Sequence, residues 1–255
     1  KRFDYLDSGT EQVIPKKAGK GVTALLTVSC GLFSLVALGI PVGSNFIMSF
    51  SDSFSIEKFR FTLDNYQNVL QMDGALLTGV RHSLTLASVA AVIGLLVGFA
   101  VAYILTYSQF KLKRLIDMLT LVAMAVPGVV LGIGYIFVWN QKWLQPLGLN
   151  LYGKPSILVL ASVASAVPLI NRVLVGGMSK VPQELLTASQ VQGARLGRRL
   201  KTILLPLLHS SMVSAVLAAF GGSVFNLAIT TILYPPNYST LPVYISDSYN
   251  DLNFG

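Results

Sequence analysis

Residues 185–206 read LLTASQVQGARLGRRLKTILLP. The stretch is polar and basic and carries two glycines, Gly193 and Gly197, yet the runs on either side of it are almost free of charge. The run 156–178 contains only one charged residue, Arg172, and the run 202–246 contains none. The role of the stretch therefore depends on what those two runs are.

The composition indicates a membrane protein. Of the 255 residues 53% are hydrophobic and only 12% are charged, whereas soluble domains carry about 25% charged residues. The net charge of +8 falls in short clusters between apolar runs, so it does not predict nucleic-acid binding. A single cysteine, Cys30, excludes an intrachain disulfide, and neither histidine has a partner at ligand spacing, so no metal site is predicted.

Five uncharged or nearly uncharged runs are long enough to cross a membrane, which takes about 20 residues in a helix. The last run is too long for one helix, and the YPPN sequence at 234–237 is expected to end it. The predicted spans are 21–51, 83–110, 118–141, 156–178 and 203–232.

The basic residues orient these spans. Thirteen of the 19 Lys and Arg residues lie before the first span, after the second or after the fourth. The positive-inside rule therefore predicts a cytoplasmic N-terminus and a cytoplasmic loop at 179–202. We expect residues 1–20 to be a cytoplasmic basic segment or linker and 21–255 a transmembrane domain, with at least one further span beyond Gly255.

Small residues four positions apart let membrane helices approach closely. Two of the predicted spans carry such stripes, which favours a packed bundle over isolated anchors: Ala90, Gly94, Gly98 and Ala102 in one, and Ser211, Ala215, Ala219 and Ser223 in the other.

The opening stretch has a specific spacing. Read backward, it has ILLP at 203–206, nine residues, Gly193, three residues, and then Ala188 and Ser189. This resembles the EAA loop of binding-protein-dependent ABC importer permeases, which reads Glu-Ala-Ala, three residues, Gly, nine residues, Ile-x-Leu-Pro. The sequence departs from the motif in having Thr187 at the glutamate position and Ser189 at the second alanine position.

The resemblance implies an all-α polytopic bundle of the importer permease type, with about five membrane helices here and one beyond. It also implies a multi-pass subunit of the cell membrane. The implied partners are two copies of an ABC ATPase that bind ATP and Mg, an extracytoplasmic substrate-binding protein, a second permease half or subunit, and membrane lipid. No cofactor is implied for this chain, and it lacks a GxxxxGK[ST] phosphate-binding loop, so it is not predicted to be an enzyme.

In the family the loop forms a short helix that inserts into a cleft of the ATPase, here within residues 182–206. The resemblance implies these coupling residues: Glu184, Thr187, Ala188, Ser189, Gly193, Arg195, Ile203, Leu205 and Pro206. An acid in the first turn suits a helix start, and a glycine permits a sharp reversal. The basic residues of the loop have the alternative role of only orienting the protein.

Two polar residues of the last span, Ser223 and Asn226, are candidates for the translocation path, or else bond to neighbouring helices. The segment FGGSVFNLAITTILYPPNYSTLPVYI resembles ferric-iron-type permeases, and the KRFDY start resembles the linker of fused permeases in that group. Ferric iron is therefore the favoured cargo, with phosphonate, thiamine and polyamine as alternatives. A secondary transporter, the alternative from another class, would need coupling acids within the spans, where Arg172 is the only charge.

Overall fold

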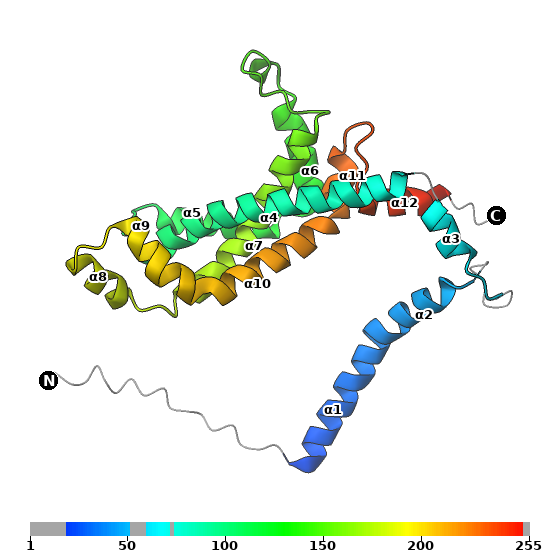
Figure 1. The fold of residues 1–255 in the computed structure, drawn as a ribbon, viewed down its shortest axis with the longest axis horizontal. Helices are drawn as coiled ribbons and strands as arrows, with labels where there is room; N and C mark the ends of the chain where they lie inside the picture. The colour runs from blue at the N-terminus through cyan, green and yellow to red at the C-terminus, as the bar shows by residue number, and fades with distance from the viewer. Residues whose placement is uncertain (1–18, 52–59, 72–73, 252–255) are drawn as a thin grey trace. The chain divides into compact units, whose positions relative to one another are not determined.

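The computed structural model describes residues 19–51, 60–71 and 74–251 (Figure 1). Apart from an isolated bridge between Ser51 and Phe61, the regular structure in these ranges is helical. The prediction of an all-α protein is thus confirmed. The chain divides into two units, Lys1–Met72 and Asp73–Gly255, which we describe separately. Of the predicted basic segment 1–20, all but the last two residues lie outside the described ranges.

The first unit contains one long apolar helix. Helix α1 (Lys20–Ser34), a π-helical turn η1 (Leu35–Gly39) and α2 (Ile40–Met48) follow one another without a break over 29 residues. Pro41 has no N–H to donate, and the wider π turn just before it accommodates the missing bond. This helix confirms the first predicted span. The short α3 (Asp64–Gln71) follows.

The core of the second unit is formed by three long helices, α4 (Ala75–Tyr107), α7 (Pro155–Met178) and α10 (Leu205–Val224), which pack against one another (Figure 1). The small-residue stripe of α4 is buried against α7. A Cβ atom on Gly98 would lie 2.7 Å from Cγ2 of Ile170, so only glycine permits this approach. The prediction of a packed bundle is confirmed.

Helices α7 and α10 meet through a second close contact. A Cβ atom on Gly177 would lie 2.5 Å from the hydroxyl oxygen of Ser211. Farther along α10, Ala215, Ala219 and Ser223 of the predicted stripe are buried. The stripe therefore serves the packing of α10.

The predicted span 118–141 is interrupted at Pro127. It consists of α5 (Lys113–Ala125) and α6 (Gly128–Trp139), whose axes differ by 110°. Proline disfavours a helical conformation for the residue before it, and Val126 accordingly is extended, with ψ of 122°. Pro127 then caps α6, which points away from the three-helix core (Figure 1). A short turn η3 (Lys142–Leu144) leads back toward α7.

The predicted helix 203–232 is wrong at both ends. It begins earlier, because α9 (Leu196–Arg199) and the π turn η4 (Leu200–Leu204) continue directly into α10. It ends earlier, at Val224, and α11 (Leu227–Leu233) starts anew because the Asn226 side chain accepts a hydrogen bond from the Ile229 N–H at 3.2 Å. Within the described ranges four helices are long and apolar enough to cross a membrane, and five if α5 and α6 form one broken span.

Helix α12 (Leu241–Asp251) is fixed to the start of α4. The Ser83 hydroxyl accepts a hydrogen bond from the Leu241 N–H at 2.8 Å, and the His82 ring contacts the Ser239 carbonyl at 2.9 Å and stacks on Tyr238. Burial raises the pKa of Tyr238 above its ordinary value. This end of the second unit is opposite the end that carries α8 (Figure 1).

Candidate functional site: the exposed helix α8

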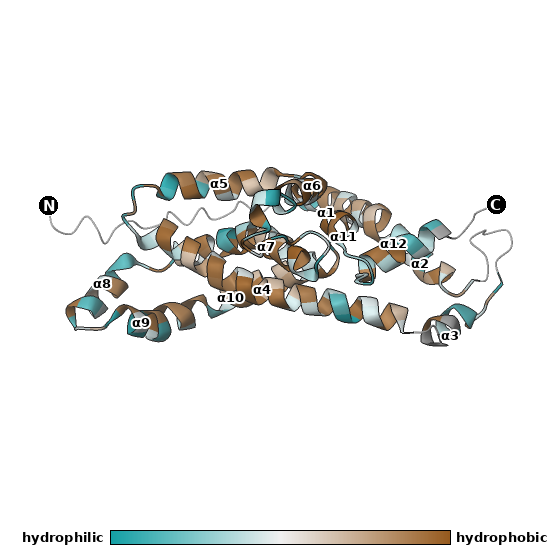
Figure 2. Cartoon of the chain, turned by 90° about the horizontal axis from the view of Figure 1, so that it is seen from above, coloured by the Kyte–Doolittle hydropathy of each residue, from teal (hydrophilic) through white to brown (hydrophobic). Residues whose placement is uncertain are grey.

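Helix α8 (Gln183–Val191) lies at the end of the second unit, between α7 and α9 (Figure 1). Pro182 caps it with φ of −59°, and Glu184 in its first turn carries a negative charge at the positive end of the helix dipole. Figure 2 shows polar residues gathered on α8 and α9, in contrast to the apolar spans. The short helix predicted from the motif is therefore present at the predicted place.

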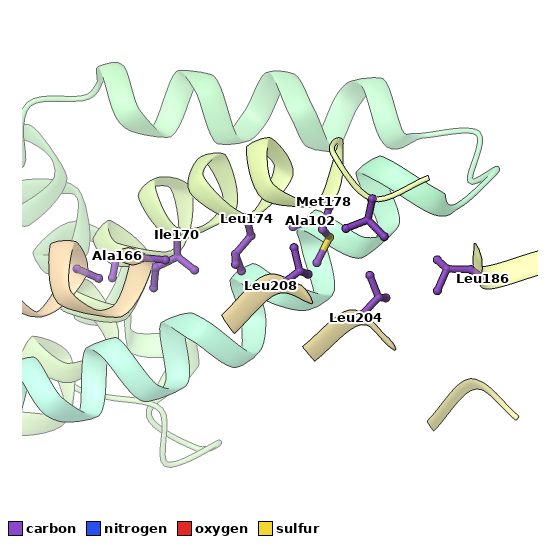
Figure 3. Close-up of a cluster of buried hydrophobic side chains, with 11 residues drawn as sticks. Ala102, Ala166, Ile170, Leu174, Met178, Leu186, Leu204 and Leu208 are labelled. Atoms are coloured by element: carbon purple, nitrogen blue, oxygen red, sulfur yellow. The ribbon is translucent and has the colours of Figure 1, made fainter. Parts of the chain in front are cut away.

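One side chain anchors α8 to the bundle. Leu186 is only 5% exposed and belongs to a buried apolar cluster that continues through Leu204 of η4 and Leu208 of α10 to Met178 of α7 (Figure 3). Leu186 therefore packs α8 against side chains of α7 and α10.

The opposite face of α8 is apolar and exposed. Leu185, Ala188 and Val191 follow at intervals of three and share one side of the helix, and Val191 is 88% exposed. Large apolar side chains that are exposed together on a polar helix mark a surface for a partner. We call Leu185, Ala188 and Val191 the outer face of α8.

The two positions that depart from the motif bond to their own helix. The Thr187 hydroxyl donates to the Glu184 carbonyl at 3.0 Å, and the Ser189 hydroxyl donates to the Leu186 carbonyl at 2.8 Å. Thr187 is exposed next to the outer face, whereas Ser189 is half-buried. Neither hydroxyl disturbs the helix.

Gly193 ends α8. Its φ is +79°, its N–H bonds the Gln190 carbonyl at 2.9 Å, and the Ala194 N–H bonds the Ser189 carbonyl at 3.0 Å. This pair of bonds is the Schellman motif, which requires a left-handed residue and so favours glycine. The expected sharp reversal is thus present, and its cause is backbone conformation, since a Cβ atom on Gly193 would meet no atom within 4 Å.

The remaining motif residues lie in the helix that follows. Arg195 precedes α9 and is exposed, and the Arg199 guanidinium donates to the Gln190 side chain at 3.1 Å, which ties α9 to α8. Ile203 is half-buried against the apolar cluster, while Leu205 and Pro206 begin α10. The π turn η4 ends two residues before Pro206 and accommodates the hydrogen bond that proline cannot donate, as in the first unit.

Sequence reasoning missed Tyr107. Its hydroxyl donates to the Met178 carbonyl at 2.8 Å and contacts the Val181 carbonyl at 3.3 Å. It therefore links the end of α4 to the segment that enters α8. A tyrosine at the end of a span is a common interfacial residue, but nothing in the sequence identifies its partner 71 residues away.

The partner of Arg172 was also missed. Its guanidinium bonds the Asp117 carboxylate at 2.7 Å and the Thr120 hydroxyl at 3.1 Å, which joins α5 to α7. Asp117 lies one residue before the start of the predicted third span, so nothing in the sequence places it in the bundle.

Of the two candidates for the translocation path, one lines a cavity and the other does not. Asn226 lines a cavity of about 310 Å³ where the α5–α6 break meets the α10–α11 break, together with Ser165 and Met124. Ser223 is 7% exposed and does not line it. The cavity lies about 30 Å from the start of α10, the length of a 20-residue helix. The described ranges contain no group of three or more His, Cys, Asp or Glu residues placed to hold a metal ion.

Comparison with known proteins decides the family. A family model described as "Binding-protein-dependent transport system inner membrane component" matches residues 74–255, which include the whole described part of the second unit. The chain belongs to this family. It is an ABC importer permease subunit, and as such it is a transport component and not itself an enzyme.

Relatives of this permease differ in cargo. It is 26% identical over 217 residues to the ferric transport system permease protein FbpB of Actinobacillus pleuropneumoniae, covering 84% of this chain and 30% of that protein. It is 29% identical over 227 residues to the putative 2-aminoethylphosphonate transport system permease protein PhnV of Salmonella paratyphi A, covering 89% and 83%. It is 28% identical over 218 residues to the trehalose/maltose permease protein MalG of Thermococcus litoralis, covering 81% and 75%.

A solved structure confirms the fold. The permease resembles a chain in the crystal structure of a bacterial ABC transporter involved in the import of the acidic polysaccharide alginate. The TM-score is 0.71 at 17% identity, with 93% of this chain and 84% of that chain covered. The predicted permease-type helix bundle is thereby confirmed.

Proposed function

We propose that α8 receives the movement of ABC ATPase subunits, two per transporter, and passes it to the membrane helices. The observation that supports this is the division of α8 into two apolar faces, with Leu186 buried in the bundle and the outer face open to a partner. The ATPase subunits would bind ATP and Mg and perform the hydrolysis. The side of the membrane that carries α8 would be the cytoplasm, in line with the distribution of basic residues.

Three contacts would carry the movement into the bundle. Leu186 packs on the α7 and α10 side chains of the buried cluster. Tyr107 holds the α7–α8 junction to α4, and Arg199 holds α9 to α8. A push on the outer face would thus displace α4, α7 and α10 together.

We infer that the cargo passes near the cavity lined by Asn226. It lies where two spans are broken, and broken membrane helices expose backbone groups that can bind polar cargo. The exposed face of α6 would be covered by the second permease half or subunit, and an external binding protein would deliver the cargo.

Ferric iron and 2-aminoethylphosphonate are the two cargoes that we propose, with ferric iron favoured by the segment at 220–245. Both are supported by relatives of similar identity. The test is titration of the partner binding protein with ferric iron, 2-aminoethylphosphonate, trehalose, thiamine and polyamines. Binding of trehalose, thiamine or a polyamine in preference to the other two would refute this cargo assignment.

The coupling role has a direct test. In a Cys30→Ser background, Ala188→Cys on the outer face should cross-link to a cysteine in the ATPase cleft, and the yield should change with nucleotide. Leu217→Cys, exposed on the membrane part of α10, is the matched control and should not cross-link. The proposal would be refuted if the Ala188→Cys transporter still coupled ATP hydrolysis to uptake but formed no cross-link to the ATPase.

A further inference from the structure

An apolar groove runs between three helices of the second unit. It has a volume of about 400 Å³ and is bounded by Val97 of α4, by Leu119 and Ala123 of α5, and by Val167 and Pro168 of α7. A water molecule occupies about 30 Å³ of liquid, and a cavity lined by apolar side chains stays dry. The groove therefore has the size and the chemistry for a hydrocarbon chain.

The groove leads to a basic end. Ile116, Thr120 and Ala123 of α5 line it, and Lys113 lies on the same helical stripe one turn earlier. Arg114 is next to Lys113, and Figure 2 shows the polar start of α5. Both basic side chains are exposed, and neither forms an ion pair within the described ranges. Positive charge is thus left at the mouth of an apolar groove.

Arg172 adds donors at the same end. Its Nη2 atom contacts the Asp117 carboxylate and the Thr120 hydroxyl, and Thr120 lines the groove. Its Nε atom is buried and cannot reach a bound molecule, but its side chain is 28% exposed and its Nη1 atom forms no hydrogen bond with the described residues. An arginine has five N–H donors in a planar fork, so this guanidinium retains donors for an anionic oxygen.

We infer that the groove binds one acyl chain of an anionic phospholipid, whose phosphate is held by Lys113, Arg114 and Arg172. The groove lies between membrane-spanning helices, where acyl chains are the surrounding solvent. Its basic end lies on the same side of the second unit as α8 (Figure 1), so the lipid belongs to that leaflet. The site goes beyond the transport function and does not depend on the cargo.

The test uses the purified transporter with its ATPase subunits and phosphatidylglycerol that carries a photoactivatable diazirine in one acyl chain. Labelled peptides should map to α5 and α7. Each basic residue near an anionic surface strengthens binding about fivefold, so Lys113→Gln with Arg114→Gln should weaken labelling about 25-fold. Lys201→Gln, an exposed basic residue near α8, is the matched control and should leave labelling unchanged.

A second variant tests the groove itself. Ala123→Phe with Ala164→Phe fills it and should abolish labelling of α5 and α7 while co-purification of the ATPase shows that the transporter remains assembled. Equal labelling by phosphatidylcholine and phosphatidylglycerol would overturn the inference, because the groove would then not select anionic lipid. So would unchanged labelling in the Lys113 and Arg114 variant, or a protein segment in place of lipid in the groove of the assembled transporter.

Discussion

The hydroxyl of Tyr107 donates a hydrogen bond to the carbonyl oxygen of Met178 at 2.8 Å. Tyr107 is the last residue of α4 and Met178 is the last residue of α7. The bond therefore joins the ends of two spans at the point where the chain turns toward α8.

Removal of this bond should loosen the junction. We expect Tyr107→Phe to lower the free energy of unfolding by about 1 kcal/mol, the net contribution of one hydrogen bond, and to reduce uptake while the ATPase still co-purifies. Thermal unfolding in detergent and an uptake assay measure the two effects. Tyr103→Phe is the matched control, because the Tyr103 hydroxyl has no hydrogen bond in the described part of the chain. Equal behaviour of both variants would contradict the role of Tyr107.

The contact between α4 and α7 depends on Gly98. Gly98→Ala places a methyl group 2.7 Å from Ile170, and overpacking of this kind costs about 1–3 kcal/mol. Gly176→Ala is the control, because its Cβ atom would meet nothing within 4 Å. We expect Gly98→Ala to lower the unfolding temperature and Gly176→Ala to leave it unchanged. The reverse order would show that the helices do not meet as described.

Gly193 allows backbone strain to be separated from contact with a partner. Any side chain at φ of +79° costs about 1–2 kcal/mol, less for asparagine, and the space around Gly193 is open in this chain. Gly193→Ala and Gly193→Trp thus share the strain but differ in bulk.

We expect normal amounts of all Gly193 variants in the membrane. Co-purification of the ATPase should be near normal for Gly193→Asn and partly lost for Gly193→Ala. Gly193→Trp should lose both co-purification and uptake. Arg198→Ala should be mild, because a single exposed charge contributes little. If Gly193→Trp couples as well as Gly193→Ala, the turn does not face the ATPase.

The predicted orientation can be tested with two exposed positions at opposite ends of the second unit. In a Cys30→Ser background, Gly197→Cys should react with a membrane-impermeant thiol reagent only from the cytoplasm, and Ser248→Cys only from outside. Labelling of intact cells and of inverted vesicles gives the answer. Reaction of both from the same side would refute the orientation.

The position of α8 was predictable because its signals are local. The spacing of Ala188, Gly193 and Pro206 predicted the place of α8, and the glycine predicted the sharp reversal at its end. The buried role of Leu186 was not predictable, because α8 offers apolar residues on two faces and only the fold decides which one packs.

The broken spans were harder to predict for a different reason. The Pro127 in the middle of the predicted span does not by itself specify a break, because a break needs a surface against which α6 can pack. Gly132 provides it by letting α6 approach Ile232 of α11, a pairing of residues about 100 positions apart. Likewise, Asn226 stands within an apolar run of the sequence, which gives no sign of a helix end. Only its hydrogen bond from the Ile229 N–H shows that it starts a new helix.

The helix that follows α8 runs without a break from Leu196 to Val224, so the basic residues of α9 and the apolar residues of α10 belong to one continuous helix of 29 residues. Its buried side chains are spread along this length, from Leu204 and Leu208 to Ala219 and Ser223. No single point serves as a pivot. Under the proposed coupling role, α10 would therefore shift as a whole against its neighbours, and the cavity beside Asn226 at its far end would change shape with it.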